Sequence, residues 1–518
     1  MPSPESEVPP NRRDHRRSRL LPDFGDEGNI PFSPAHPLGS ADLAQLSHRP
    51  DMKPLIFFLI LLGFLFLGEL SAIAESEPRK NVLFLVVDDL NTRLGCYGDD
   101  RVQSPNIDRL AARGLLFERA YCQYPSCGPS RASVLTGLRP HHTRVIDNRT
   151  RLREALPNAI TLPQWFRRHG YRTSRVGKVF HQDVPTDLGT GGLDDPDSWD
   201  EVVNPRGRDK DDEALLTVHT PSLPLPDQMA FLAAAGNDTE QTDGKVAGET
   251  IRLLRQNAGK KFFLAAGFYR PHLPSIAPKK WFNLCALDQT TLPALPQQYR
   301  ERVPEPALAS TPVWPNFGTT ELQARECMLA YHATVSFVDA QIGRVLDALD
   351  ALDLAKSTLI VLWGDHGFHL GEHGLWRKNS LFEESTRAPL ILAAPWIADS
   401  QGRSCPNPVE FIDIFPTVTE AAGLPLPQAL DGLSLLSLLE NPGASHDRPA
   451  YSEVHFGDIP GRTVRTSGWR YTEWGPEGSA GRELYNERLD PEEMNNLAED
   501  PSHQEVRGKL RALLAKNA

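Results

Sequence analysis

The sequence has few cysteines and no excess of positive charge. Six cysteines in 518 residues are too few for a disulfide scaffold, although one or two bridges remain open alternatives. The formal net charge of −12 argues against a nucleic-acid partner held by bulk electrostatics. We therefore expect no nucleic-acid partner, and an anionic ligand would need a local group of Arg, Lys, His or metal.

Internal repeats and coiled-coil heptads are also absent from the sequence. Hydrophobic residues make up 40% and charged residues 24%, a composition that is typical of globular proteins. A chain of 518 residues exceeds what one hydrophobic core usually holds, so we expect two folded parts.

The N-terminal region lacks an apolar run of membrane-spanning length. Residues 1–51 are rich in Arg, Pro, Asp and Ser, which predicts disorder, and we interpret them as an upstream extension that precedes the true start at Met52. Residues 52–74 contain Lys53, a short apolar run and a small-residue end, as a signal peptide does. This predicts export to a periplasmic, secreted or lysosome-like location. The alternative is an uncleaved signal anchor, with the membrane as a partner.

Continuous apolar runs alternate with amphipathic segments in the middle of the chain. The runs predict buried strands, and together with the intervening helices they predict an α/β fold, a doubly wound and mostly parallel sheet with helices on both faces. The predicted strands are 81–87, 115–121, 170–178, 261–268, 359–363 and 389–394. The predicted helices are 104–111, 161–170, 246–256, 322–349 and 413–422.

Two further regions have a different character. Residues 182–243 and 285–318 are rich in loop-forming residues, and we interpret them as long surface loops of the kind that select substrates. From residue 446 short strand-like pieces precede a final helix, which predicts a small antiparallel α+β subdomain. We therefore place a catalytic α/β domain at 75–445 and a C-terminal subdomain at 446–518.

Polar residues follow three of the predicted strands. Asp88 and Asp89 follow the first strand, Lys178 and His181 follow another, and Asp365-His366 follows a third. Ligands of open α/β sheets bind beyond the carboxyl ends of the strands, and adjacent carboxylates suit a hard divalent cation. The alternative for the Asp pair is an ordinary solvated turn.

A cysteine stands in an unusual context at Cys127-Gly128-Pro129-Ser130-Arg131. Gly-Pro favours a turn, and Ser130 could be the N-cap of a helix over 130–135. A helix N-terminus attracts anions and lowers the pKa of a nearby thiol, which predicts a reactive Cys127 beside an anionic ligand. The alternative is a small buried cysteine. A nucleophile beside a metal and several cationic groups is typical of enzymes that transfer a tetrahedral anion.

These residues resemble the signature of the sulfatase family, C-x-P-S-R followed by Thr-Gly, in the alkaline-phosphatase superfamily. The resemblance runs from about residue 80 to 500 and is strongest to the iduronate-2-sulfatases. Besides the signature, which ends at Thr136-Gly137, the stretches that carry it are 81–90, 95–98, 177–181, 270–274, 364–367, 370–374, 376–378 and 470–472.

The resemblance implies two cofactors. Cys127 would be oxidised to formylglycine (3-oxoalanine) by a formylglycine-generating enzyme. Asp88, Asp89, Asp365 and His366 would bind Ca²⁺, with the oxidised Cys127 also contacting the metal. This ligand set is rich in oxygen, which favours Ca²⁺ over Zn²⁺.

The resemblance also implies catalytic roles. Arg131 would hold the formylglycine hydrate and the sulfate charge, while Lys178 and Lys378 would bind sulfate oxygens. His272 would contact the substrate and protonate the leaving alcohol, and His181 would abstract the proton that releases sulfate. A thiolate that attacked sulfate would form a thiosulfate-type adduct from which sulfate is not easily released. One hydroxyl of an aldehyde hydrate can attack sulfur, and the other lets the hydrate collapse and expel sulfate.

The expected substrate is a sulfated carbohydrate, with a 2-O-sulfated uronate favoured over a small sulfate ester. Phe368-His369 departs from the iduronate-2-sulfatase pattern, which leaves recognition of the uronate open. Two rival functions also stay open: a phosphate or phosphonate ester hydrolase of the same superfamily, and an inactive, glycan-binding homologue.

Overall fold

The computed structural model describes residues 80–517. The predicted signal peptide at 52–74 and the extension at 1–51 lie outside the described residues. Within the described part of the chain, no helix combines the length and the apolar character that a membrane crossing requires.

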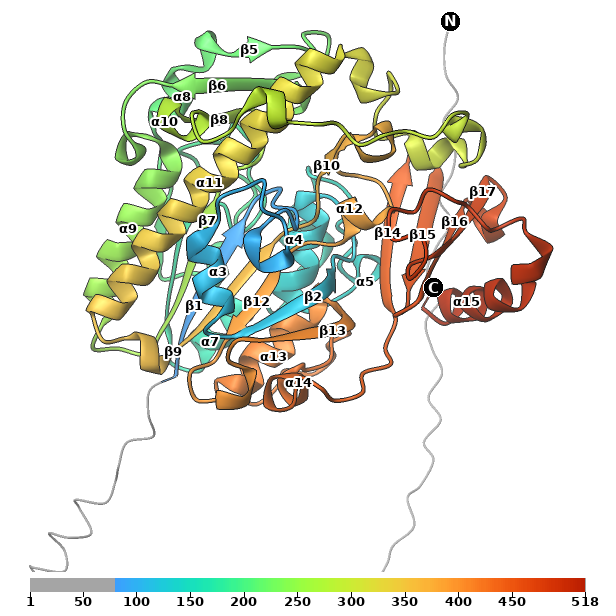
Figure 1. The fold of residues 1–518 in the computed structure, drawn as a ribbon. Helices are drawn as coiled ribbons and strands as arrows, with labels where there is room; N and C mark the ends of the chain where they lie inside the picture. The colour runs from blue at the N-terminus through green and yellow to red at the C-terminus, as the bar shows by residue number, and fades with distance from the viewer. Residues whose placement is uncertain (1–79, 518) are drawn as a thin grey trace, which may run out of the picture. The chain divides into compact units, whose positions relative to one another are not determined.

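An eight-stranded, mostly parallel sheet runs through the centre of the fold (Figure 1). Its strand order is β13-β2-β12-β9-β1-β7-β3-β4. Only β12 is antiparallel to its neighbours, β2 and β9. The strands are β1 (Asn81–Val87), β2 (Leu115–Tyr121), β3 (Arg172–Gly177), β4 (Glu201–Val203), β7 (Phe262–Phe268), β9 (Thr358–Gly364), β12 (Leu390–Ala393) and β13 (Arg403–Glu410). The predicted parallel α/β sheet is confirmed.

Helices cover both faces of this sheet because its central strands are apolar on both sides. In β1, Val82 and Phe84 pack into one core, while Leu83 and Leu85 pack into the other. Each such fully buried side chain contributes about 1.5–3 kcal/mol to folding. The core of Leu83 also contains α3 (Pro105–Ala111), α9 (Thr242–Asn257) and α11 (Glu321–Ala351). The core of Val82 contains α4 (Cys127–Thr136), α7 (Leu162–Arg168), α13 (Ile414–Ala421) and α14 (Leu436–Glu440).

The C-terminal residues form an antiparallel four-stranded sheet and a helix, as predicted (Figure 1, red). The elements are β14 (Ala450–Phe456), β15 (Ile459–Arg465), β16 (Trp469–Trp474), β17 (Gly481–Asn486) and α15 (Gln504–Lys516). Leu510 and Leu514 of the helix pack against Val464 and Tyr471 of the sheet. This apolar layer gives the C-terminal sheet a core of its own.

The prediction of plain loops over 182–243 is wrong in part. This segment contains α8 (Arg208–Asp211) and β4, and it contributes β5 (Thr217–Val218) and β6 (Ala230–Ala234) to a three-stranded sheet with β8 (Ser275–Pro278). The edge strand β13 was also missed, because Pro406 and Pro408 lie within it and proline is tolerated only at sheet edges and bulges. Short elements complete the fold: α5 (Pro140–Thr143), α6 (Leu152–Ala155), α10 (Lys279–Phe282), α12 (Glu383–Thr386), β10 (His369–Leu370) and β11 (Trp376–Arg377).

All six cysteines lie among the described residues, and none of them forms a disulfide. The alternative of one or two bridges is therefore not realised in this structure.

Candidate active site

The predicted polar residues meet at one edge of the large sheet. Asp88 and Asp89 follow β1, Asp365 follows β9, and Lys178 follows β3. Val87 at the end of β1 is in register with Gly364 at the end of β9, so the acidic residues after the two strands become neighbours. The backbone N–H of Asp89 donates to Asp365 Oδ1 at 3.0 Å. The parallel register therefore builds the site, as the binding edge of an open α/β sheet requires.

Cys127 is the first residue of α4, three residues earlier than the predicted helix start. Ser126 takes the N-cap position, whereas Ser130 lies inside the helix and its hydroxyl donates to the carbonyl of Asp365. The expected low pKa of the thiol is wrong. Complete burial, assisted by the negative charge of Asp88, raises the pKa of Cys127 well above its usual value. The thiol is therefore protonated at neutral pH.

Two buried cations hold Asp88. Arg131 donates from Nη2 to Asp88 Oδ1 at 2.9 Å and from Nε to Asp365 Oδ2 at 2.9 Å. Lys178 Nζ donates to Asp88 Oδ2 at 2.6 Å. Burial by itself raises the pKa of Asp88, but the positive charges around it, Lys178 first and then Arg131, outweigh burial and hold this pKa well below its usual range. Asp88 is therefore an anion.

Lys378 and His366 surround the thiol from the other side. Lys378 Nζ donates to Asp89 Oδ1 at 2.6 Å and lies 3.6 Å from Cys127 Sγ. His366 Nε2 lies 3.3 Å from the same sulfur and 3.4 Å from Asp89 Oδ1. His366 Nδ1 donates to the carbonyl of Gly367 at 2.8 Å, which turns Nε2 toward the carboxylates as in metal-binding histidines.

The donor set suits a hard divalent cation. Carboxylate oxygens of Asp88, Asp89 and Asp365 lie within 4.8 Å of one another, and so do ligand atoms of Asp89, Cys127 and His366. Asp89 Oδ2 is buried and has no hydrogen-bond partner among the described residues. A buried carboxylate oxygen without a partner requires an explanation, and oxygen-rich coordination by Ca²⁺ would supply one.

A cavity of about 80 Å³ opens beside this cluster. Asp89, Lys378, His272 and His181 are among the residues that line it. His272 Nε2 is 3.8 Å from Asp89 Oδ2, while its Nδ1 donates to the carbonyl of Leu273 at 2.6 Å. Burial, with the charge of Lys378, lowers the pKa of His272 well below its usual value, so its imidazole is neutral.

The structure brings every predicted site residue to the cluster or its cavity. His181 is the most peripheral, because it lines the cavity but bonds to Asp183 through Nε2 at 3.0 Å. Sequence reasoning missed Asn148, which accepts hydrogen bonds from Gly128 N at 2.8 Å and from Ser126. It also missed Arg377 on the cavity wall, for which adjacency to Lys378 was the available signal.

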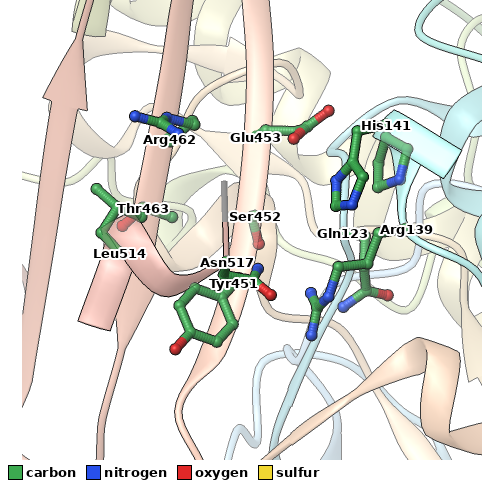
Figure 2. Close-up of a pocket in the computed structure, with 11 residues that line it drawn as sticks. Gln123, Arg139, His141, Tyr451, Ser452, Glu453, Arg462, Thr463, Leu514 and Asn517 are labelled. Atoms are coloured by element: carbon green, nitrogen blue, oxygen red, sulfur yellow. The ribbon is translucent and has the colours of Figure 1, made fainter. Parts of the chain in front are cut away.

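A separate hollow lies between α5 and the C-terminal sheet (Figure 2). Tyr451 and Glu453 of β14 and Arg462 of β15 line it, with Arg139 and His141 on the opposite side. It contains none of the predicted site residues, so the cavity beside Cys127 is the candidate for catalysis.

The fold and the site together are typical of a hydrolase that acts on esters of tetrahedral anions. The family model described as Sulfatase matches residues 80–424, and the model described as N-sulphoglucosamine sulphohydrolase, C-terminal, matches residues 371–518. The chain belongs to the sulfatase family and is accordingly a sulfuric ester hydrolase.

Individual relatives agree with this assignment. The chain is 33% identical to iduronate 2-sulfatase of Mus musculus, covering 88% of this chain and 97% of the relative. It is also 33% identical to a sulfatase of Formosa agariphila, covering 89% and 92%. Among solved structures, the phosphonate monoester hydrolase of Agrobacterium radiobacter superposes with a TM-score of 0.69 at 25% identity, covering 84% and 95%.

Proposed function

We propose that this enzyme hydrolyses a sulfate ester of a sulfated glycan, and that the unit attacked is a 2-O-sulfated uronate. The observation that carries the proposal is the environment of Cys127. This residue stands in the signature at the start of α4, and Lys378, His366 and Asp89 approach its sulfur. The identity with an iduronate 2-sulfatase, spread over most of both chains, supports the substrate class.

Two groups that the chain itself does not encode complete the proposal. Formylglycine, made from Cys127 by a formylglycine-generating enzyme, would supply as its hydrate the nucleophile that the buried thiol cannot. Asp88, Asp89, Asp365 and His366 would hold Ca²⁺, which would offset the negative charge of the sulfate.

The buried cations would do most of the electrostatic work. Lys178 and Lys378 are almost fully enclosed, and in such a site their charges act on sulfate oxygens far more strongly than in water. Arg131 also donates from Nη1 to the carbonyls of Lys178 and Val179 at 2.6 and 3.1 Å. Its contacts support a role in fixing the carboxylates, while its predicted contact with the hydrate stays a proposal.

His272 is our candidate for protonating the leaving alcohol. Its Nε2 faces Asp89 on the cavity side, but the neutral ring carries its proton on Nδ1. Donation therefore requires a second proton, which the negative charge of a bound sulfate ester would favour. His181, with Nδ1 buried and without a partner among the described residues, is our candidate for taking up the proton that releases sulfate.

We also propose that the protein is exported, because residues 52–74 have the pattern of a signal peptide. Sequencing the N-terminus of the secreted protein tests this. A mature chain that begins near Glu75 supports cleavage, and a chain that retains residues 52–74 contradicts it.

Mass spectrometry of the tryptic peptide 120–131 tests the central step. We expect an aldehyde in place of the Cys127 thiol in protein that was produced with the generating enzyme. An unmodified Cys127 throughout a fully active preparation would overturn the proposed nucleophile.

The main rival function is that of a phosphonate or phosphate ester hydrolase. The likeness to a solved phosphonate monoester hydrolase supports this rival. Parallel assays of 4-nitrophenyl sulfate, phosphate and phenylphosphonate separate the two functions. We expect sulfate to be preferred, and a preference of several orders of magnitude for phosphorus esters would refute the proposal. Absence of turnover by Ca²⁺-loaded, formylglycine-containing protein would favour an inactive glycan-binding homologue.

A further inference from the structure

One wall of the cavity beside Cys127 is not used by the proposed chemistry. Arg377 lies on this wall, directly before Lys378 in sequence, and Asp227 is its ion-pair partner. Arg377 is the only arginine among the described residues that line this cavity. Asp227 comes from the segment 182–243, so this wall joins two distant parts of the chain.

The backbone places Arg377 and Lys378 on the same cavity. Side chains of consecutive residues in an extended strand point to opposite sides. Arg377 and Asn379 instead have left-handed backbone conformations, with φ of 70° and 68°. These conformations interrupt the alternation on both sides of Lys378, and non-glycine residues adopt them at a cost in free energy. These strained backbone conformations thus place the side chains of two adjacent cations, Arg377 and Lys378, on one cavity.

The guanidinium of Arg377 is prepared to bind an anion. Its side chain is only 15% exposed, and its Cζ lies 5.0 Å from the centroid of the Phe317 ring in a cation–π contact. Nη1 donates to a carboxylate oxygen of Asp227, whose side chain is 49% exposed. Nε is buried and has no partner among the described residues. Arg377 therefore pairs with a half-exposed carboxylate, which a ligand could replace, and it has a donor, Nε, without a partner among the described residues.

We propose that Arg377 is a specificity-determining residue that binds the carboxylate of the sulfated uronate. A planar guanidinium binds a carboxylate through two parallel hydrogen bonds, which a neutral sugar could not accept in the same way. Lys378 would hold the sulfate end of the same sugar, and Asp227 would share or release its ion pair as the sugar carboxylate binds. The inference rests on the proposed function, because it requires a uronate as the leaving group.

The test compares two sugars that differ only in the carboxylate. One is a disaccharide with a 2-O-sulfated uronate at its non-reducing end, and the other is the same compound with the carboxyl group reduced to an alcohol. We expect the wild-type enzyme to favour the uronate in kcat/KM by about 10- to 100-fold, the range for hydrogen bonds to charged groups. Arg377→Gln should collapse this ratio toward one, mainly through KM for the uronate, and Arg377→Lys should restore part of it.

Two further variants control for indirect effects. Arg206→Gln removes an exposed arginine that pairs with Asp211 in the same segment, 182–243, and it should keep the wild-type ratio. Asp227→Asn removes the competing carboxylate and should keep or increase the preference for the uronate. Because this variant leaves Arg377 in place, it tests the idea even if Arg377→Gln folds poorly.

The outcomes separate this inference from the proposed function. If the wild-type enzyme cleaves both sugars equally well, or if Arg377→Gln slows both equally, the role of Arg377 is refuted while sulfatase activity stands. If the wild-type enzyme cleaves neither sugar but cleaves 4-nitrophenyl sulfate, the proposed substrate class falls and this inference falls with it.

Discussion

Two buried clusters of charge in this molecule differ in whether they border a cavity. The candidate active site gathers Asp88, Asp89 and Asp365 with Arg131 and two lysines at the sheet edge. The second cluster, which we call the junction cluster, joins the large sheet to the C-terminal sheet. Its members are Tyr121, Glu383, Arg465, Arg470, Glu487 and Glu493.

The junction cluster is held together by its own members. Arg465 pairs with Glu383 at 3.1 Å and with Glu487 at 2.9 Å, and Arg470 pairs with Glu383 and Glu493. Although burial raises the pKa of Glu383, the charges of Arg465 and Arg470 bring it well below its usual range. Buried atoms without a partner among the described residues occur in both places: Asp89 Oδ2 in the candidate active site, and Arg470 Nη1 and Glu487 Oε1 in the junction cluster. The difference is that the junction cluster lines no part of the cavity beside Cys127. From this difference we expect the junction cluster to serve stability and the cluster beside the cavity to serve a ligand.

Removing the nucleophile precursor should give the largest effect on activity. Cys127→Ala should lower turnover of 4-nitrophenyl sulfate by about 10⁴-fold or more, because loss of a covalent nucleophile removes the whole pathway. The cost in stability should be about 1 kcal/mol, because only one small group is lost. Cys405→Ala, at another buried cysteine, is the matched control and should stay active. Equal activity of the two variants would contradict a role for Cys127.

Breaking the junction cluster should have the reverse effect of Cys127→Ala: a large loss of stability with activity retained. Arg470→Met should lower the free energy of unfolding by about 3–5 kcal/mol, because it leaves Glu383 and Glu493 buried with one cation fewer. Urea unfolding measures this, and turnover per folded molecule should be retained. Arg113→Met removes an exposed pair with Asp350 and should cost about 0–1 kcal/mol. A similar cost for both variants would remove the distinction between the junction cluster and a surface pair.

Replacing the proposed acid should have a smaller effect that depends on the leaving group. His272→Gln should lower kcat for a sugar sulfate by about 10²–10³-fold, in the range for general acid catalysis. The loss for 4-nitrophenyl sulfate should be smaller, because nitrophenolate leaves without protonation. The exposed His142→Gln, which removes a pair with Asp431, should change neither rate. Equal losses on both substrates would assign His272 to binding alone.

The smallest expected effect is on the pH dependence of the free energy of unfolding, through Glu483 of the C-terminal sheet. Burial raises the pKa of Glu483 to about 7. The hydrogen bonds that Trp474 and Tyr485 donate to its carboxylate lower this pKa, but these donors are neutral and do not offset burial. A raised pKa means that the native state holds the proton more tightly, so this stabilisation is present below about pH 4.5 and is lost as pH rises toward 7. Glu483→Gln should therefore flatten the pH dependence of unfolding between pH 5 and 7 by up to about 1.4 kcal/mol per unit.

Glu372 provides the control of opposite sign. Burial raises its pKa, but Arg93 outweighs this and lowers it to about 2. Its contribution to stability is therefore present above about pH 4.5 and is lost only as the pH falls toward 2. Glu372→Gln should leave the slope between pH 5 and 7 unchanged, and an effect there equal to that of Glu483→Gln would contradict our interpretation.

Much of the fold could be predicted because its signals are local. The apolar runs that become β1, β7 and β9 are visible in the sequence, and Asp88-Asp89 and Asp365-His366 stand where these runs end. The strand β6 was missed because it is short and its two partners, β5 and β8, are themselves brief. The pair of Arg377 and Asp227 joins positions 150 residues apart, and no local pattern indicates it.

The sequence by itself determined the α/β class, the family signature around Cys127 and the set of polar residues at the strand ends. Apolar periodicity and motif spacing are properties of neighbouring residues, so they can be recognised in the sequence without a structure. The tertiary structure decided that burial raises the pKa of Cys127, that Lys178 faces Asp88 while Lys378 faces Asp89, and that Arg377 shares a cavity with Lys378. Desolvation and charge pairing depend on what the fold packs around each group, and that is settled only when distant segments meet.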